Sequence, residues 1–287
     1  MKSYLSLIKF SHTIFALPFA LLGYFLGSQV KGDGWDGWLL LKVILCMVFA
    51  RSAAMAFNRY ADRDIDAKNP RTAIREIPAG IIKARSALLF ILLNSAAFIF
   101  TTWWINPLCF WLSPVALLII LGYSLTKRFT AWCHLVLGLG LSLAPIGAFL
   151  AVTGYFHPLP IYYSLAIIFW VAGFDIIYAL QDEEFDRAQQ LNSIPALLGK
   201  QKALWLSTFF HLLTMLFVTL AAFQLAELFP NMGFLHWLGL AIFAALLVYQ
   251  HSLVSPRDLS KVNLAFFTTN GMASIVFCLL IILDLSL

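Results

Sequence analysis

Charged residues are scarce in this sequence. Only 11% of its 287 residues are Asp, Glu, Lys or Arg, whereas about 25% is typical of soluble domains. A water-soluble protein of this length could not cover its surface with so few charges while 61% of its residues are hydrophobic. The composition therefore excludes soluble enzymes, disordered chains and small secreted domains, and it predicts an integral membrane protein.

Cysteine is equally scarce, and its spacing excludes two further kinds of site. Cys46, Cys109, Cys133 and Cys278 share no Cys-x-x-Cys spacing, and each lies in or beside an apolar run. This pattern indicates neither a zinc site nor a disulfide framework. The sequence also lacks Walker, dinucleotide-binding and catalytic-serine motifs.

Nine long apolar stretches are present, and each approaches the roughly 20 residues that a helix needs to cross a bilayer core. The predicted spans are Ile14–Val30, Trp38–Phe57, Ser86–Ile105, Pro107–Ser124, Cys133–Thr153, Ile161–Leu180, Ala203–Ala226, Gly233–Leu253 and Val262–Leu283. No linker or soluble segment interrupts them. The sequence therefore predicts an all-α, nine-helix membrane protein with one domain over residues 1–287.

The basic residues are distributed unevenly among the predicted loops. Sixteen Lys and Arg residues lie on the N-terminal side of the spans, against Lys31 alone on the opposite side. The positive-inside rule then places the N-terminus in the cytoplasm and predicts a cell inner membrane protein. The net charge of +5 is thus explained by membrane topology, and nucleic acid is not an expected partner.

An acidic cluster follows the second predicted span. Asn58, Asp62 and Asp66 have the i, i+4, i+8 spacing that stacks side chains on one face of a helix, here predicted to continue out of the membrane. Neighbouring carboxylates repel one another unless a cation lies between them, and Mg²⁺ prefers such hard oxygen ligands. Arg51 lies two turns earlier on the same face, inside the apolar run, where an unpaired guanidinium is costly.

A second acidic cluster follows the sixth predicted span. Asp182 and Asp186 are one turn apart, and Asp175 lies two turns before Asp182 on the same stripe. Both clusters lie at the cytoplasmic ends of spans, so two carboxylate pairs can face each other and hold Mg²⁺ ions that bridge a diphosphate. Three further acidic residues point off these stripes and are expected to face water or pair with local Arg: Asp64, Glu183 and Glu184.

These two clusters carry a family resemblance. The stretch Asn58-Arg59-x-x-Asp62-Arg63-x-x-Asp66 with Pro70-Arg71-Thr72 resembles the first aspartate-rich signature of the UbiA superfamily of intramembrane prenyltransferases. The later Tyr178-Ala179-x-x-Asp182-x-x-x-Asp186 resembles the second. One departure is Arg59, where many members carry Asp, but the stripe of Asn58, Asp62 and Asp66 remains complete.

The resemblance implies an enzyme that transfers a polyprenyl group from its diphosphate to an aromatic ring, with Mg²⁺ as cofactor and membrane lipid around it. The implied metal-binding and catalytic residues are Asn58, Asp62, Asp66, Asp182 and Asp186. The implied substrate-contacting residues are Arg51, Arg71, Tyr123, Lys127, Arg128, Asp175 and Tyr178. The pattern is most similar to 4-hydroxybenzoate polyprenyltransferases of ubiquinone and menaquinone biosynthesis, and a hydroxylated naphthoate is the alternative acceptor.

The residues also leave other interpretations open. Juxtamembrane charges often only solvate helix ends, and Lys127 and Arg128 are equally typical of membrane anchors. A secondary transporter would also use the intramembrane charges Arg51 and Asp175, although clustering at one rim favours an enzyme. Arg51 itself is predicted to bind the acceptor carboxylate, to pair with Asp175, or to contact the diphosphate. The sequence does not indicate an oligomeric state.

Overall fold

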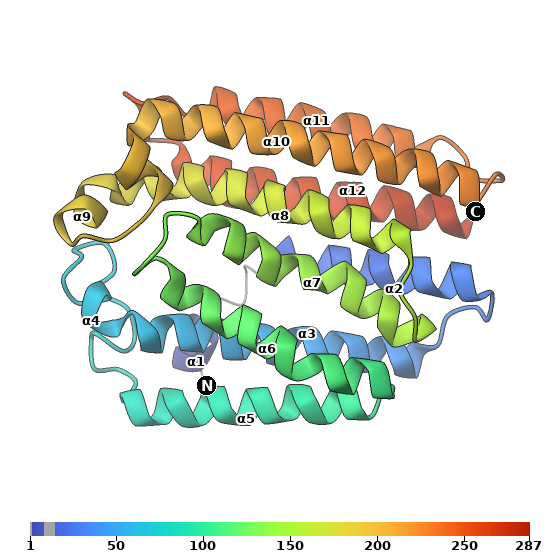
Figure 1. Cartoon of the computed structure of the whole chain (residues 1–287), viewed down its shortest axis with the longest axis horizontal. Coiled ribbons are helices and arrows are strands. Elements are labelled where there is room, and N and C mark those ends of the chain that lie inside the picture. Colours follow the sequence, from blue (N-terminus) through green and yellow to red (C-terminus); the bar gives the residue numbers. More distant parts are fainter. Residues whose placement is uncertain (1, 9–14) are drawn as a thin grey trace.

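Long helices make up most of the protein, as the apolar runs predict. The structure is a computed structural model that describes residues 2–8 and 15–287 (Figure 1). Its α-helices are α1 (Lys2–Leu7), α2 (Leu17–Lys31), α3 (Gly37–Ala61), α4 (Arg63–Asp66), α5 (Ala84–Trp103), α6 (Pro107–Thr126), α7 (Cys133–Thr153), α8 (Pro158–Ala179), α9 (Glu183–Ala188), α10 (Ile194–Leu228), α11 (Leu235–Ser252) and α12 (Asn270–Ser286). A 3₁₀ turn (η2, Leu180–Asp182) follows α8, and a π-helical segment (η3, Leu264–Thr269) precedes α12.

The all-α membrane fold is confirmed. Eight helices within the described ranges are long and apolar enough to cross a membrane. The one predicted span without such a helix is the first, Ile14–Val30, which corresponds to α2; this helix has only 15 residues, and Ile14 lies outside the described part of the chain. The predicted cytoplasmic location of the N-terminus remains a prediction.

Most predicted spans agree with the helices to within a few residues, but one differs more. The seventh span was expected to begin at Ala203, whereas α10 begins at Ile194. The Ser193 side chain caps this helix by accepting a hydrogen bond from the amide of Ala196, and Pro195 occupies its first turn. The extension bends at Gly199, whose φ of 74° lies in the left-handed region. Apolar content alone therefore missed the first part of this helix, because Lys200, Gln201 and Lys202 interrupt the apolar run.

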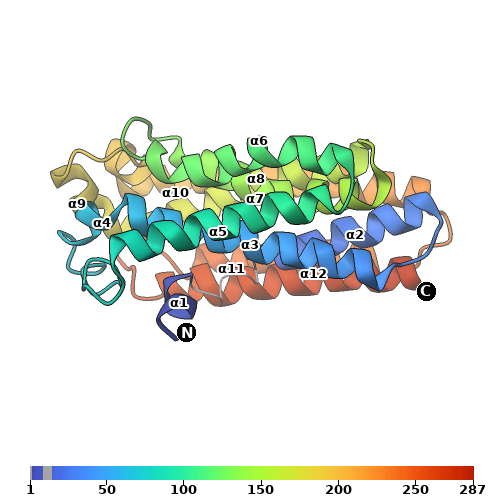
Figure 2. The same cartoon turned by 90° about the horizontal axis from the view of Figure 1, so that it is seen from below.

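The long helices run along one axis of the molecule, and two of the short helices, α4 and α9, lie together at one end (Figure 1). The view from below shows the same elongated bundle, with α4 and α9 again at one end and the C-terminus at the other (Figure 2). Helix α8 packs against both α7 and α10, and α2 packs against α7 and α12. Aromatic rings fill the interior between these helices, including Phe19, Trp170 and Phe277.

Small residues allow the closest of these helix contacts. A Cβ atom on Gly23 of α2 would lie 2.1 Å from the carbonyl oxygen of Pro145 in α7. Two turns earlier in α7, a Cβ on Gly138 would lie 2.3 Å from the carbonyl oxygen of Ile168 in α8. Such close approach of backbones is how membrane helices gain packing energy without a hydrophobic driving force between them. Glycine at these two positions fixes α7 between α2 and α8.

We expect Gly23→Ala to destabilise the protein, because the added methyl group must push α2 away from α7. The expected loss is about 2 kcal/mol of unfolding free energy, as for overpacked cores, measured by reversible unfolding in detergent micelles. Gly122→Ala in α6 is the matched control, since a Cβ there meets no atom within 4 Å. Equal stability of the two variants would contradict this account of the α2–α7 contact.

Candidate functional site

The first acidic cluster lies where α3 ends. The prediction of one uninterrupted helix through Asn58, Asp62 and Asp66 is wrong, because α3 ends at Ala61 and Asp62 separates it from the single turn of α4. The backbone path nevertheless stays close to helical, since the amide of Asp62 donates to Asn58 O (3.0 Å) and that of Asp66 donates to Asp62 O (2.7 Å). The three side chains therefore keep their stacked order despite the break.

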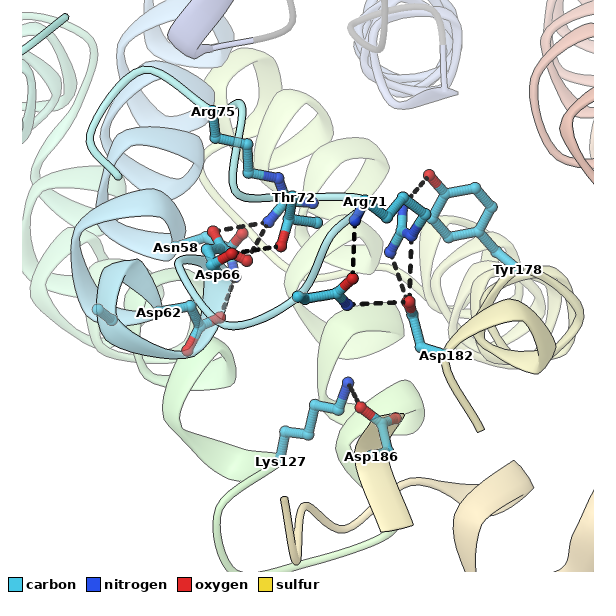
Figure 3. Close-up of polar contacts among 12 residues, drawn as sticks. Asn58, Asp62, Asp66, Arg71, Thr72, Arg75, Lys127, Tyr178, Asp182 and Asp186 are labelled. Atoms are coloured by element: carbon cyan, nitrogen blue, oxygen red, sulfur yellow. Dashed lines mark hydrogen bonds and ion pairs between the residues drawn. The ribbon is translucent and has the colours of Figure 1, made fainter. Parts of the chain in front are cut away.

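The second cluster lies across from the first, on η2 and α9. Each of the four predicted metal-binding aspartates is paired with a basic side chain, and Figure 3 shows three of these pairs, those of Asp66, Asp182 and Asp186. The ion pairs are Asp62–Arg128 (3.1 Å), Asp66–Arg75 (2.6 Å), Asp182–Arg71 (2.5 Å) and Asp186–Lys127 (2.6 Å). We call these four acid–base pairs the polar rim. Both acidic clusters thus lie at the same end of the molecule, and their joint binding of a metal remains a prediction.

Arg71 joins the two halves of the polar rim. Its Nε and Nη2 atoms donate to the two oxygens of Asp182, at 3.1 and 2.5 Å, and its Nη1 donates to the hydroxyl of Tyr178 at 3.0 Å. Asn69 supports this arrangement, because its amide nitrogen donates to Asp182 and its amide oxygen accepts from the Arg71 backbone. Figure 3 shows the loop after α4 reaching across to α8 and η2 through these contacts.

Asp186 is the most deeply buried of the four aspartates, with an exposed fraction of 0%. Besides Lys127, it accepts a hydrogen bond of 2.8 Å from the hydroxyl of Ser193, the residue that caps α10. The amide of Asn192 also donates to Lys127 O at 2.8 Å. Asp186 therefore ties the loop after α6 to the beginning of α10.

Asp62 is in a different electrostatic environment. Burial raises the pKa of its carboxyl group above the ordinary value, and the hydrogen bond from Arg128 partly counteracts this effect. Asn58 donates to the second carboxylate oxygen at 3.1 Å, and Arg128 also donates to Ala61 O at 2.6 Å. The negative charge of Asp62 is thus more costly to maintain, and an additional cation would stabilise it.

A cavity of about 360 Å³ lies among α3, α5, α6 and α7. Arg51 is its only charged lining residue within the described chain, and the buried Nε atom of Arg51 has no hydrogen-bond partner there. Tyr123 lines the cavity near the rim end of α6. Thr102 and Ser113 donate their hydroxyls to carbonyls of their own helices, at 2.7 Å each, so they add little polarity to the wall. The cavity is therefore apolar around a single guanidinium.

Asp175 does not join the polar rim. Its Oδ2 lies 2.7 Å from Nδ1 of His134, and Nε2 of His134 accepts a hydrogen bond from the amide of Ile194. The predicted stripe from Asp175 to Asp182 fails because α8 ends at Ala179 and gives way to the 3₁₀ turn η2. The alternative that Arg51 pairs with Asp175 is also not observed, since the partner of Asp175 is His134.

The sequence reasoning missed several residues of the site. Arg75 and Asn69 contact the aspartates of the polar rim, and Ser193 contacts Asp186. Arg75 and Asn69 flank the Arg71-Thr72 pair of the first motif, so their proximity to it was the available signal. The expectation for Glu183 is confirmed, because it pairs with Arg187 (2.9 Å) instead of joining the rim.

The chemistry of these side chains fits Mg²⁺, because carboxylate and amide oxygens are the ligands that it prefers. Their arrangement is that of a paired state, since within residues 2–8 and 15–287 no three acidic, His or Cys side chains gather at one point. Each carboxylate of the polar rim is instead paired with a basic side chain. A metal ion could take the place of these bases if the basic side chains moved to a bound anion.

The fold and the site define a polytopic helical membrane protein with a charged rim above an apolar cavity. The chain belongs to the UbiA prenyltransferase family, whose family model matches residues 16–272. It is therefore a prenyltransferase, as predicted, and the transporter alternative is not supported.

Named relatives and solved structures agree with this assignment. The 4-hydroxybenzoate octaprenyltransferase of Aeromonas hydrophila is 32% identical over 243 residues, covering 84% of this chain and 82% of that protein. The enzyme of the same name from Nitrosomonas europaea is 31% identical, covering 88% and 84%. The apo structure of a UbiA homolog from Aeropyrum pernix K1 superposes with a TM-score of 0.83 at 31% identity, covering 95% of this chain and 98% of that chain. A UbiA homolog from Archaeoglobus fulgidus bound to GPP and Mg²⁺ shares the fold, with a TM-score of 0.74 at 23% identity, and the match covers 99% of this chain and 100% of that chain.

We expect Asp186→Ala to lower stability in the absence of any ligand. The change removes the hydrogen bond from Ser193 and the ion pair with Lys127, so the expected loss is about 1–2 kcal/mol, measured by denaturant unfolding in micelles. Glu184→Ala, two residues away and exposed, is the control and should change little. If both variants unfolded at the same denaturant concentration, Asp186 would not tie the loop to α10.

Proposed function

We propose that this protein transfers a polyprenyl group from polyprenyl diphosphate to an aromatic acid of the 4-hydroxybenzoate type. The reaction depends on Mg²⁺ and belongs to quinone biosynthesis. The site faces the cytoplasm of a cell whose inner membrane holds the protein, and residues 1–287 act as one domain. The observation that carries this proposal is the polar rim of four acid–base pairs next to an apolar cavity lined by Arg51, whose Nε has no hydrogen-bond partner among the described residues. The names of the relatives support the choice of acceptor.

The diphosphate binds at the polar rim. Asn58, Asp62 and Asp66 of the first cluster and Asp182 and Asp186 of the second would hold Mg²⁺ there. The metal supplies charge neutralisation for the diphosphate and so assists its departure. This assignment is supported by the solved homolog from Archaeoglobus fulgidus, which binds GPP and Mg²⁺.

The bases of the rim bind the same diphosphate. Three bases of the rim are paired with carboxylates but have more than a third of their side-chain surface exposed: Arg71, Lys127 and Arg128. They can therefore turn towards a ligand. Their guanidinium and ammonium groups, once released from the carboxylates, would donate to phosphate oxygens. Tyr178 keeps Arg71 oriented through its hydroxyl. This interaction stabilises the negative charge that develops on the leaving group as the allylic carbon–oxygen bond breaks.

The acceptor lies below the rim, in the cavity. Arg51 occupies α3 about 10 Å closer to the membrane centre than Asn58, as its seven-residue offset implies. Its guanidinium offers bidentate hydrogen bonds to a carboxylate. This contact orients the ring so that its electron-rich carbon attacks the allylic carbon, and the ring carbon then loses its proton. The apolar walls exclude water that would intercept the allylic cation.

We expect purified protein with octaprenyl diphosphate, 4-hydroxybenzoate and Mg²⁺ to form prenylated 4-hydroxybenzoate, detected by product mass. Chelation of the metal should abolish the reaction. Asp62→Ala and Asp182→Ala should each reduce kcat/KM at least about 100-fold, because a lost carboxylate removes stabilisation of the leaving group.

The control for these variants is Asp64→Ala, because Asp64 is adjacent to the site but exposed and paired only with Arg63. The same assay is repeated with a hydroxylated naphthoate in place of 4-hydroxybenzoate. Turnover of the naphthoate alone would reject the benzoate acceptor and retain prenyl transfer. Full activity of both aspartate variants would reject the metal and diphosphate site.

We expect Arg51→Lys to raise the KM for 4-hydroxybenzoate about tenfold, since lysine does not reproduce the bidentate contact. The KM for the prenyl diphosphate should stay nearly constant. Arg63→Lys is the matched control, because Arg63 lies in α4, outside the four pairs of the polar rim, and does not line the cavity. Both KM values are measured by steady-state kinetics with each substrate varied in turn. A raised KM for prenyl diphosphate alone would assign Arg51 to the diphosphate instead.

A further inference from the structure

The proposed reaction releases one proton, and the polar rim offers no free base to accept it. When a ring carbon of the acceptor bonds to the allylic carbon, its own hydrogen must leave as a proton so that the ring becomes aromatic again. The four aspartates of the polar rim are proposed to hold Mg²⁺, and a carboxylate that binds a metal must stay deprotonated. The proton acceptor must therefore lie outside the rim.

Asp175 is a half-buried carboxylate with one oxygen left free. It lies four residues before the end of α8, at the end of the molecule where α9 lies (Figure 1). Its Oδ2 lies 2.7 Å from Nδ1 of His134, whereas no group of the described residues donates a hydrogen bond to its Oδ1. The side chain is 24% exposed. A charge inside a membrane span is costly, so a carboxylate with an accessible and unsatisfied oxygen there indicates a functional role.

His134 holds this carboxylate in its charged form. The amide of Ile194 donates to Nε2 of His134 at 3.3 Å, so Nε2 carries no proton and the ring proton lies on Nδ1. Nδ1 therefore donates to Asp175, and the pair keeps a net negative charge. This is the arrangement of a general base with an orienting partner, because the imidazole fixes the carboxylate in place and leaves it unprotonated.

A second His–Asp pair in the described chain shows what a purely structural pair requires. Asp284 accepts from Nδ1 of His236 at 2.6 Å, and the amides of Gly233 and His236 donate to its two oxygens at 2.9 Å each. Its side chain is only 1% exposed. Both oxygens of Asp284 are thus satisfied by the beginning of α11, whereas Asp175 has a single donor and an open oxygen.

Tyr123 connects Asp175 with the position proposed for the acceptor. It lines the cavity near the rim end of α6, and its phenol interacts electrostatically with both Arg51 and Asp175. Arg51 on α3 and Asp175 on α8 therefore lie within range of the same side chain. An aromatic ring whose carboxylate is bound by Arg51 would lie in the space that these residues share.

We propose that Asp175 accepts the proton of the acceptor ring and that His134 is its positioning residue. This inference rests on the proposed prenyl transfer. The electron pair of the allylic carbon–oxygen bond leaves with the diphosphate, and a pair of ring π electrons forms the new carbon–carbon bond. The ring carbon then gives its proton to Oδ1 of Asp175, and the electrons of that carbon–hydrogen bond restore the aromatic ring. The carboxylic acid returns the proton to water before the next turnover.

The test uses an acceptor that carries deuterium on the reacting ring carbon. Asp175→Asn keeps the size of the side chain and an oxygen for the hydrogen bond from His134, but it cannot take the proton. Its kcat should fall at least about 100-fold, as for the loss of a general base. Proton loss then limits the rate, so the isotope effect on kcat should be larger in this variant than in the wild-type protein. The KM for prenyl diphosphate should stay nearly constant.

Variants of His134 separate positioning from packing. His134→Asn can still donate from its amide to Asp175 and should keep most of the activity, whereas His134→Phe removes the donor. His134→Phe should therefore lower kcat and raise the isotope effect, as Asp175→Asn does. Asp284→Asn is the matched control, because it neutralises the carboxylate of the other His–Asp pair at the opposite end of the molecule. It should leave both kcat and the isotope effect unchanged.

Four results would overturn the inference. An unchanged kcat in Asp175→Asn would assign the proton to the departing diphosphate or to water, and prenyl transfer itself would stand. A lower kcat without a larger isotope effect would show that Asp175 acts in another step. If Asp175→Asn folded poorly, the His134 variants would decide, since equal losses in His134→Asn and His134→Phe would reduce the pair to packing. If the wild-type protein formed no prenylated acid, the proposed function would fail together with the inference.

Discussion

The pairing of carboxylates with bases at one end of the bundle is the constraint on which the site depends. Apolar helices fix how the spans pack, but their contacts do little to hold the connecting loops. The polar rim does this, because Arg71 links the loop after α4 to η2, Arg128 links the loop after α6 to the end of α3, and Lys127 links that same loop to α9. A buried or half-buried carboxylate without a partner would be costly. The loops are therefore held where their charges can meet.

The same pairing constrains what can bind. A metal ion alone would take carboxylates from their bases and leave those cations without partners, and a diphosphate alone would take the bases and leave carboxylates unpaired. Only when both are present does every charge of the rim regain an opposite charge. The proposed pairing of Mg²⁺ with diphosphate thus follows from the electrostatics of the empty arrangement, in which Asp62 already carries a raised pKa through burial.

The sequence predicted the membrane helices and the two aspartate spacings, because apolar length and helical periodicity are local properties. It failed where structure depends on contacts between distant segments. The break between α3 and α4 at Asp62 keeps helix-like hydrogen bonds, so no glycine or proline marks it. No local spacing links His134 to Asp175, because the two residues lie 41 positions apart on different helices, yet their side chains are in contact. Arg75 and Ser193 likewise acquire their carboxylate partners only through folding.

Depth along the bundle separates the tasks of the site. Charge is concentrated at the polar rim, where water and loops can satisfy it, and Arg51 is the single charged side chain that lines the cavity below within the described residues. A guanidinium left there without a partner on Nε is costly, so its retention needs an anionic partner that the rest of the described chain does not supply. The rest of the cavity wall is apolar, so a ligand there meets only apolar side chains apart from Arg51. The proposed function divides these levels between two substrates, because the diphosphate with its hydrocarbon tail belongs to the donor and the carboxylate-bearing ring to the acceptor. In that proposal the two substrates meet between the polar rim and Arg51.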